Sequence, residues 1–337
     1  MVVINYRVGV AEKLGIDYAT LSGLNPGLIY ANITGFGDTG RYARRAGSDN
    51  VAQAYSGLMA AEAKTDEFGA PAPINSTTVI DRAAGLAAAT GICAALYHRS
   101  RTGEGQQLSV SLLQTGLELL SHQVMREPVH DATLRDPLLG RLRERRTAGA
   151  RYDEIAALRT SQGMRFASHR IYYGGYHAQE GALVLGALTK RNRDAIRAIV
   201  DVEDETDDPA FDQSDPASRA RVETWRLALQ ERLLTRPASE WVQQFVAAGV
   251  PASVVNFPEE MADDIHVRET AMMTSLVHEV TGSQQVVGPP VRTSKTPSAA
   301  IRAAPPRACH SREVLREAGI AGEEIDALLG AGVITQS

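Results

Sequence analysis

The sequence predicts an α/β fold, in which short apolar strands alternate with helices. Two apolar runs, residues 2–4 and 28–33, are typical of buried strands, and helical spacing lies between them. A third transition falls at Asp81, where the β-branched run 77–80 gives way to an Ala- and Leu-rich helical stretch that continues to Tyr97. We therefore expect parallel strands joined by helices in the first third of the chain.

Composition limits the classes of partner. A chain of 337 residues exceeds the usual size of one core, so we expect two domains, and 44% apolar with 22% charged residues is typical of a globular protein. The net charge of -5 gives no support to nucleic-acid binding, which needs a basic surface. The basic run 141–146 is interrupted by Glu144 and indicates a solvated helix face. We expect no nucleic-acid partner.

The cysteines and the apolar runs exclude further classes. Cys93 and Cys309 lie far apart, with no His or Cys at metal-ligand spacing, so neither a disulfide framework nor a zinc site is expected. No uninterrupted apolar run is long enough to span a bilayer, and the first seven residues lack the order of a signal peptide. We expect a cytoplasmic protein with no metal and no membrane partner.

Asp81 is the first candidate for chemistry. At a strand-to-helix junction a carboxylate lies where open α/β sheets bind ligands, and the positive end of the helix dipole favours its ionised form, which predicts a low pKa. Asp is also a preferred N-cap residue, so a purely structural role stays open. Asp49, before the helical run 51–60, has the same two interpretations. The glycine-rich turn 34–40 matches neither a dinucleotide fingerprint nor a P-loop and is interpreted as an active-site loop.

The rest of the chain predicts a second domain. Residues 126–160 are charge-rich and suit a linker, and a turn at 179–181 between two strand-like runs predicts a hairpin. Helices are expected over 190–200, 217–234 and 238–248. The tract 201–218 holds eight acidic residues and no basic ones, which predicts a solvated, mobile insertion.

An ordered series of motifs resembles the class III CoA-transferases, the group of the formyl-CoA and carnitine CoA-transferases. The motifs are Asn5-Tyr6-Arg7-Val8-Gly9, Thr34-Gly35-Phe36-Gly37, Gly47-Ser48-Asp49, Asp81 and Arg101-Thr102-Gly103-Glu104-Gly105-Gln106, followed by the segments 172–185, 240–255, 288–292 and 313–332. The resemblance covers nearly the whole chain.

The resemblance implies a doubly wound large domain built from N- and C-terminal segments, with a smaller α+β domain inserted. The expected parts are a large CoA-binding domain over 1–125, a linker over 126–165, a small domain over 166–270, a return linker over 271–305, and helices over 306–337 that rejoin the large domain. It also implies an interlocked homodimer. Members of the family usually carry a further segment upstream, so we expect the large domain here to be incomplete at its N-terminus, either by truncation or because a separate chain supplies it.

The resemblance also assigns site residues. Asp81 matches the catalytic aspartate, whose carboxylate attacks an acyl-CoA thioester and becomes an aspartyl-CoA thioester before an acceptor carboxylate reverses the steps. Coenzyme A is then a substrate, and no prosthetic group, metal or ATP is needed. Residues that match or adjoin the CoA-contacting segments are Asn5, Tyr6, Arg7, Lys13 and Asp49. The alternative roles are strand-end turns and a solvated helix face.

Two other functions stay open. The α-methylacyl-CoA racemases share the fold but use a histidine where this chain has Ser48, and a hydroxyl is not a base near neutral pH without activation. His169 and His177 are candidate replacements that lie in another region. The second alternative is a catalytically incomplete fragment or subunit, which follows from the expected absence of the upstream segment.

Overall fold

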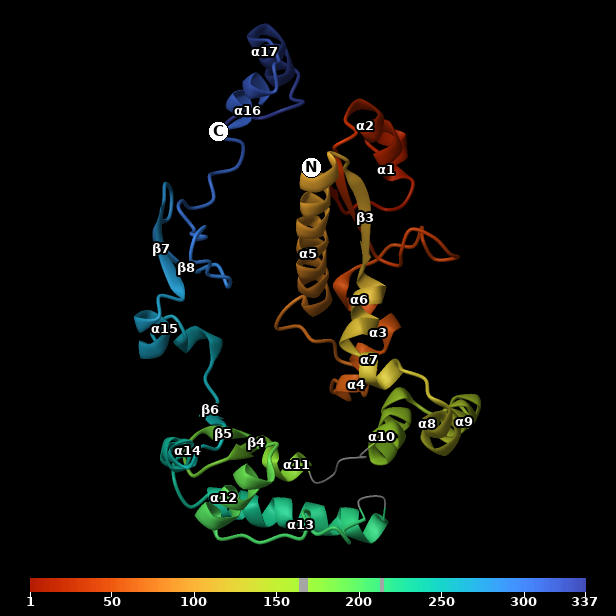
Figure 1. The fold of residues 1–337 in the computed structure, drawn as a ribbon, viewed down its shortest axis with the longest axis vertical. Coiled ribbons are helices and arrows are strands. Elements are labelled where there is room, and N and C mark those ends of the chain that lie inside the picture. The colour runs from red at the N-terminus through yellow and green to blue at the C-terminus, as the bar shows by residue number, and fades with distance from the viewer. Residues whose placement is uncertain (164–168, 213–214) are drawn as a thin grey trace. The chain divides into compact units, whose positions relative to one another are not determined.

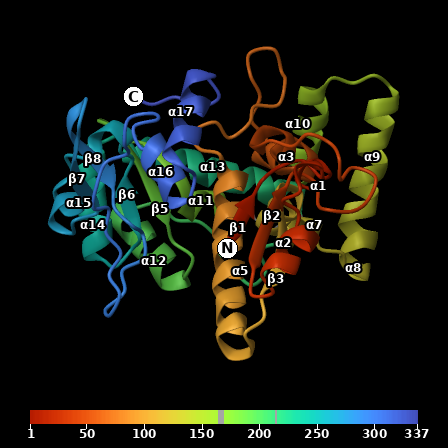
Figure 2. The same cartoon turned by 90° about the horizontal axis from the view of Figure 1, so that it is seen from above.

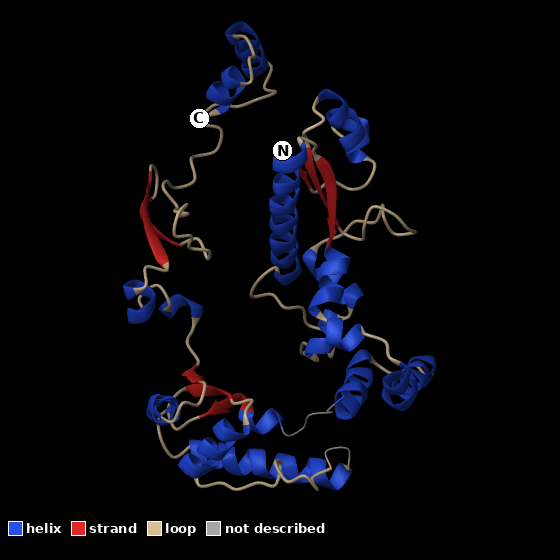
Figure 3. Cartoon of the chain, in the orientation of Figure 1, coloured by secondary structure: helices blue, strands red, loops and turns tan. Residues whose placement is uncertain are grey.

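The fold is described from a computed structural model, whose described residues are 1–163, 169–212 and 215–337. The chain forms two compact units, Met1–Arg165 and Phe166–Ser337 (Figure 1). Both contain helices and strands (Figure 3), which confirms the mixed α/β class in its general form. Each unit is described by itself.

The sheet of the first unit has three parallel strands in the order β1 (Val2–Ile4), β2 (Ile29–Thr34) and β3 (Gln106–Ser111). The central strand β2 is the most buried, as its apolar sequence predicts. The predicted strand at residues 2–4 is present, but Val3 is half-exposed. The strand β3 was not expected, because its residues are largely Gln and Ser; pairing with β2 over its whole length makes it a strand.

Helices cover both faces of this sheet (Figure 2). The helices α1 (Val10–Leu14) and α2 (Tyr18–Leu24) pack on the face of Tyr30, whose hydroxyl donates to the Ile16 carbonyl at 2.9 Å. The long helix α5 (Val79–Thr102) contacts the opposite face, where Gly91 approaches Leu108. Side chains of successive strand residues point to opposite faces of the sheet. Gln107 pairs with Tyr30 and shares its face, so the next residue, Leu108, lies on the other face.

The predicted strand at 77–80 is wrong. Val79 and Ile80 already belong to the first turn of α5, and Thr78 is its N-cap. The β-branched run has no neighbouring strand to pair with, and Ile80 is instead fully buried in a core cluster with Ala84 and Leu112. The site that was expected at a strand-to-helix junction therefore lies at the start of a helix preceded by a loop.

Helix α5 is unusually apolar. Among the described residues it alone has the length and composition of a membrane span, a property shared by core helices of soluble proteins and weak evidence when it occurs once. Its buried residues, Ile80, Ala84, Ala88 and Ala95, form one stripe at helical spacing. Leu86 and Tyr97 are exposed elsewhere on the helix.

The remaining helices of the first unit follow β2 and β3. They are α3 (Asp49–Ser56), α4 (Leu58–Glu62), α6 (Leu112–Leu119), α7 (Ser121–Val124), α8 (Pro128–His130), the π-helix η1 (Asp131–Arg135), α9 (Asp136–Thr147) and α10 (Tyr152–Gly163). Gly57 has a positive φ of 93° and separates α3 from α4, so the single helix expected over 51–60 is two. The segment expected as a linker is mostly helical.

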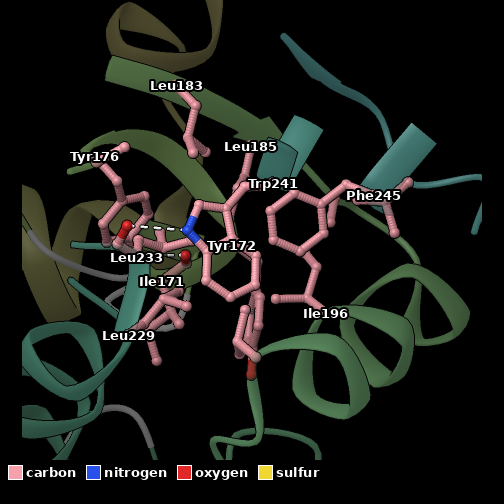
Figure 4. Close-up of a cluster of buried hydrophobic side chains, with 14 of the residues drawn as sticks. Ile171, Tyr172, Tyr176, Leu183, Leu185, Ile196, Leu229, Leu233, Trp241 and Phe245 are labelled. Carbon is pink, nitrogen blue, oxygen red and sulfur yellow. Dashed lines mark hydrogen bonds between the residues drawn. The ribbon is translucent and has the colours of Figure 1, made fainter. Parts of the chain in front are cut away.

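The second unit contains an antiparallel sheet of β4 (Tyr173–His177), β5 (Ala182–Gly186) and β6 (Ala252–Val254). The hairpin between β4 and β5 confirms the predicted turn, where Gly181 has a positive φ of 76°. The sheet packs in one core with α11 (His169–Tyr172), α12 (Lys190–Val200), α13 (Pro216–Leu233) and α14 (Ala238–Ala247). Trp241 is buried in that core and donates from Nε1 to the Leu233 carbonyl at 2.9 Å (Figure 4).

The C-terminal elements are η2 (Pro258–Glu260), α15 (Ile265–Glu269), β7 (Met273–His278), β8 (Gly282–Val287), α16 (Ser311–Glu317) and α17 (Gly322–Gly330). The hairpin of β7 and β8 was not predicted and falls in the expected return linker 271–305. That α16 and α17 rejoin the large domain stays a prediction.

The acidic tract differs from the predicted solvated insertion. Asp204 and Asp207 pair with Arg197 of α12 at 2.9 and 2.8 Å, and Asp207 also pairs with Arg193. The Asp204 side chain is 1% exposed and accepts from the Tyr172 hydroxyl. These carboxylates are therefore part of the structure of the second unit, since arginines from a neighbouring helix compensate their charge.

Candidate active site

The start of helix α5 holds the candidate nucleophile. Asp81 lies in the first turn, exposed to solvent, and within the described residues its carboxylate accepts no hydrogen bond. The N-cap residue is Thr78, whose side chain makes no capping bond. The interpretation of Asp81 as an N-cap is therefore wrong, and its carboxylate is free of a structural bond.

The cap of α5 comes from another helix. Asp49 is the first residue of α3, and its Oδ1 accepts from the backbone N–H groups of Ile80 at 2.8 Å and Asp81 at 3.0 Å. The first N–H groups of a helix have no partner within that helix, and a carboxylate satisfies two of them here. Asp49 is only 6% exposed. Its expected role as a CoA-contacting residue does not agree with this position.

A third residue, Gln53, completes the arrangement. It is fully buried one turn after Asp49, and its Nε2 donates to Asp49 Oδ2 at 2.5 Å and to the Ile74 carbonyl at 3.1 Å. Its Oε1 accepts from the Ile74 N–H at 2.9 Å. Gln53 belongs to a motif, Ala52-Gln53-Ala54, that also resembles the family, but the sequence assigned it no role. The signal for a role was a polar residue four positions after Asp49 on the apolar side of a helix.

The electrostatics of Asp81 differ from the prediction. Its pKa is raised above the ordinary aspartate range, first because neighbouring protein removes part of its hydration and second because Asp49 places a negative charge beside it. The prediction of a low pKa considered the helix dipole, but neither the loss of hydration nor the second carboxylate, and the direction of the shift is the opposite. That carboxylate comes from 32 residues earlier in the chain.

Close packing holds α3, α5 and α6 together around this point. A Cβ built on Gly116 of α6 would lie 2.8 Å from the Ser56 side chain and 3.1 Å from Ile80 Cδ1. Only glycine permits that approach. The helices that carry Asp49 and Asp81 therefore meet a third helix without a gap.

A cavity of about 390 Å³ lies beside the end of β1. Tyr6 and Arg7 line it, whereas Asn5 and Lys13 are exposed and are not among its lining residues. The lining of this cavity does not include Asp49 or Asp81. It includes Asn32, whose Nδ2 donates to Asp38 at 2.8 Å while its Oδ1 is buried without a hydrogen bond.

Topology places the segment after β1 and the start of α5 toward the same edge of the sheet. Parallel strands end at the same edge, and the segment after β1 contains Asn5 to Arg7. Helix α5 leads from its last turn through Gly103 into the start of β3, so its first turn lies toward the opposite end of that strand. The start of α5 contacts α3 and α6, which follow β2 and β3.

The glycine-rich turn folds back on itself. A Cβ on Gly35 would lie 2.7 Å from Gly47 Cα, so the two ends of the loop cross in close contact. Between them Phe36 and Tyr42 pack with Tyr55 of α3 in edge-to-face pairs, and Arg45 lies over both loop rings. Sequence analysis did not identify this aromatic cluster, which lies on the segment leading into Asp49.

Ser48, at the start of α3, offers a hydroxyl and no base. Ser48 is exposed at the N-cap of α3 and makes no capping bond. His177 lies in β4 of the second unit, and the side chain of His169 lies outside the described residues. In the part of the chain that the structure describes, no group of three or more His, Cys, Asp or Glu residues is arranged to hold a metal ion.

The fold and the site define an α/β protein with an exposed carboxylate at a helix start beside a parallel sheet. Comparison with known proteins identifies its family. The model of CoA-transferase family III matches residues 1–311, and the chain belongs to that family. This confirms the resemblance seen in the motifs.

The relatives are CoA-transferases. The chain is 30% identical to an acyl-CoA transferase of Fusarium pseudograminearum, over 99% of this chain and 67% of that protein. It is 28% identical to the human succinyl-CoA:glutarate CoA-transferase, over 98% of this chain and 69% of that protein. It is 29% identical to the acetyl-CoA:oxalate CoA-transferase of Acetobacter aceti, over 86% of this chain and 66% of that protein. The chain thus spans about two thirds of the length of these curated relatives.

Solved structures agree on the fold. A Mycobacterium tuberculosis protein superposes with a TM-score of 0.68 at 22% identity, covering 90% of this chain and 72% of that one. A CaiB/BaiF family protein from Brucella suis gives a TM-score of 0.64 at 23% identity, covering 94% and 75%. At these identities the likeness establishes the fold.

Proposed function

We propose that this protein transfers coenzyme A from an acyl-CoA to a carboxylate acceptor, with Asp81 as the nucleophile. The observation that carries the proposal is the position of Asp81, an exposed carboxylate free of a structural bond, held by its backbone on the buried Asp49. Family membership supports the reaction class. The names of the relatives suggest small dicarboxylic acids as partners, and the identity of both acyl groups is left open.

The reaction proceeds by covalent catalysis. A carboxylate oxygen of Asp81 attacks the thioester carbonyl and displaces the CoA thiolate, which leaves a mixed anhydride. The thiolate attacks the aspartyl carbonyl, releases the donor acid as a carboxylate, and forms an aspartyl-CoA thioester. The acceptor carboxylate then repeats both steps in reverse order. Each step exchanges one acyl bond for another, so no net proton, oxidant or nucleotide is consumed.

The raised pKa of Asp81 suits this role in one respect. A more basic carboxylate is a stronger nucleophile toward a thioester carbonyl, provided that it is ionised. Neighbouring protein and the charge of Asp49 both raise the basicity. Transfer should therefore fail in acid as Asp81 takes up a proton, at a pH above the ordinary aspartate range.

Coenzyme A would contact the segment after β1. Tyr6 and Arg7 line the cavity there, and a guanidinium with an aromatic ring suits a nucleotide with phosphates. Asn5 and Lys13 are exposed nearby in sequence and remain candidates for the outer part of the same ligand. Three carboxylates, Glu12, Asp17 and Asp38, also line the cavity, so phosphates would have to lie on the Arg7 side.

The proposal includes the assembly and location that the sequence predicts. We place the protein in the cytoplasm as an interlocked homodimer, with coenzyme A as substrate and no prosthetic group. Its partners would be acyl-CoA and carboxylic acids, without nucleic acid or membrane. A racemase is disfavoured because Ser48 offers no base.

The test is capture of the aspartyl intermediate. The protein is incubated with acetyl-CoA or succinyl-CoA, treated with hydroxylamine, and digested with trypsin, which releases residues 65–82 with both Asp66 and Asp81. A hydroxamate on Asp81 alone is the expected result, and Asp81→Asn should abolish it while Asp66→Asn does not. Unlabelled wild type contradicts the proposal and favours a chain that is not catalytic by itself. Equal labelling of Asp66 and Asp81 would show non-specific acylation.

A further inference from the structure

Asp49 has a position that its expected role as a ligand of coenzyme A does not explain. Both of its carboxylate oxygens are engaged inside the protein, Oδ1 by the Ile80 and Asp81 N–H groups and Oδ2 by Gln53. The residue is buried. A group in this state is not available to a substrate, but it fixes the backbone of the residue beside it.

Gln53 determines which way this carboxylate points. Its amide is fully buried, and both of its ends are bonded: Nε2 donates to Asp49 and to the Ile74 carbonyl, and Oε1 accepts from the Ile74 N–H. The loop before α5 is thereby tied to α3 through one side chain. A buried amide with donor and acceptor both satisfied has a single favourable orientation, and this orientation presents a donor to Asp49.

We infer that Asp49, held by Gln53, is the positioning residue of the reactive carboxylate: it fixes the first turn of α5 and places a second negative charge beside Asp81. This inference rests on the proposed function, because it assigns a role in the reaction of Asp81. Two effects oppose each other at this point. The N-terminal end of a helix stabilises an ionised carboxylate, and the charge of Asp49 offsets that stabilisation.

No other charged group at the helix start explains this balance. The elements packed against the first turn of α5 are α3 and α6, and α3 contributes Asp49. The one charged side chain of α6 is Glu118, which is exposed. Residues 74–78, which lead into α5, carry no ionisable side chain, and Arg82, next to Asp81, is exposed. Partial loss of hydration and the charge of Asp49 are the two causes that raise the pKa of Asp81.

Two neutral variants test the inference. Asp49→Asn keeps an oxygen that accepts from Ile80 and Asp81 but removes the charge, and Asp49→Ala removes both. The protein is labelled with ¹³C at aspartate carboxyl carbons, and the Asp81 signal, assigned by its loss in Asp81→Asn, is followed against pH by NMR. We expect either neutral variant to lower the pKa of Asp81, because each removes the negative charge beside it. The test therefore needs only one of the two variants to fold.

The same variants are then examined for reaction. In Asp49→Asn the half-maximal pH of Asp81 acylation should move down with the NMR titration, because the less basic carboxylate remains ionised in stronger acid. Asp49→Ala should in addition lose acylation at every pH, since the first turn is no longer held. The matched control is Asp66→Asn, because Asp66 Oδ1 also accepts two backbone N–H groups, from Phe68 and Ala70, in an exposed turn.

The outcomes separate the two proposals. If the wild type is acylated but neither the titration nor the pH profile moves in Asp49→Asn, the positioning role is overturned and the proposed function stands. If the titration moves but Asp81 is never acylated, the proposed function fails, and with it the role of Asp49 in that reaction. A shift in both supports both. An equal shift in Asp66→Asn would show a general charge effect and overturn the inference.

Discussion

The two units of the molecule each contain a close pair of aspartates, and the pairs differ in what compensates their charge. In the second unit Asp204 and Asp207 form ion pairs with two arginines of α12. In the first unit Asp49 and Asp81 lie at one helix start, and within the described residues neither forms an ion pair with Lys or Arg. Two backbone N–H groups and the Gln53 side-chain amide donate to Asp49 instead.

The difference appears in the titration of Asp207 and Asp81, whose pKa values shift in opposite directions, whereas the pKa of Asp204 is raised like that of Asp81. Hydrogen bonding to Arg193 lowers the pKa of Asp207, whereas burial raises the pKa of Asp204 although Arg197 contacts it. The pKa of Asp81 is raised by burial and by a like charge, with no cation to oppose them. Asp204 and Asp207 are held in ion pairs with arginines and serve the structure. The pair without arginines leaves the Asp81 carboxylate available for reaction.

The largest expected effect is on chemistry. Asp81→Asn should reduce the rate of CoA transfer by about four orders of magnitude or more, because it removes the nucleophile. Its unfolding midpoint should not fall, since the Asp81 side chain makes no hydrogen bond within the described residues. Steady-state transfer from succinyl-CoA and thermal unfolding are measured together, with Asp66→Asn as the control. A large loss of stability would place Asp81 among the structural carboxylates.

In the second unit, removal of a charged partner should reduce the stability of the protein. Arg197→Ala leaves the buried Asp204 without its cation and removes a contact over the Tyr172 ring at 5.2 Å. Loss of one partner of a buried ion pair costs about 3–5 kcal/mol, which urea unfolding measures. The control is Arg191→Ala on the same helix, an exposed residue whose loss should change stability by roughly 0.5 kcal/mol or less. Similar values for both variants would contradict the comparison.

Disturbing the packing around Asp49 and Asp81 should reduce the free energy of unfolding by a smaller amount. Gly116→Ala inserts a methyl group 2.8 Å from the Ser56 side chain and should destabilise the first unit by about 1–3 kcal/mol. It should also slow acylation of Asp81, because α6 would move away from the start of α5. Gly140→Ala in α9 is the matched control: its Cβ meets nothing within 4 Å, and the variant should be more stable by about 0.5 kcal/mol. A neutral Gly116→Ala would show that these helices do not need close contact.

Local sequence patterns predicted much of the fold. The helix at Lys190–Val200 was predicted with its observed bounds, and β2 lies within one residue of its predicted range. These segments have strong periodicity or a continuous apolar run, so propensity and packing agree. By contrast β3 is polar and forms a strand only because β2 offers it a parallel partner, which a local window does not contain.

The site, like the fold, was predicted only where local sequence carries the information. The motif series predicted the family, to which the chain belongs. It also selected Asp81 as the nucleophile, which stays a prediction. The local environment of Asp81 was predicted wrongly, because its cap and its neighbouring charge come from Asp49, 32 residues away. Gln53 was given no role, since the function of a glutamine in a helix does not show until its partner at Ile74 is known. Long-range hydrogen bonds decide the electrostatics of this site, and a single sequence does not contain them.

The smallest expected effect is on the pH dependence of stability, which should have opposite signs in Asp81→Asn and Asp207→Asn. The pKa of Asp81 is higher in the folded protein than in the unfolded chain, so its ionised form opposes folding at neutral pH. Asp81→Asn should therefore raise the unfolding midpoint slightly at neutral pH. The gain should shrink as the pH falls through the raised pKa and vanish below the ordinary aspartate range, where the carboxyl is protonated in both states.

Asp207 should behave in the reverse manner. Its pKa is lower in the folded protein, so its ionised form favours folding at neutral pH, and Asp207→Asn should be destabilising there. That loss should disappear as the pH falls through the lowered pKa of the folded state. Thermal unfolding of the wild type and both variants across the acid range measures the two differences together. If both variants changed stability in the same direction at neutral pH, the distinction between an uncompensated pair and an arginine-compensated pair would fail, because opposite charge environments require opposite signs.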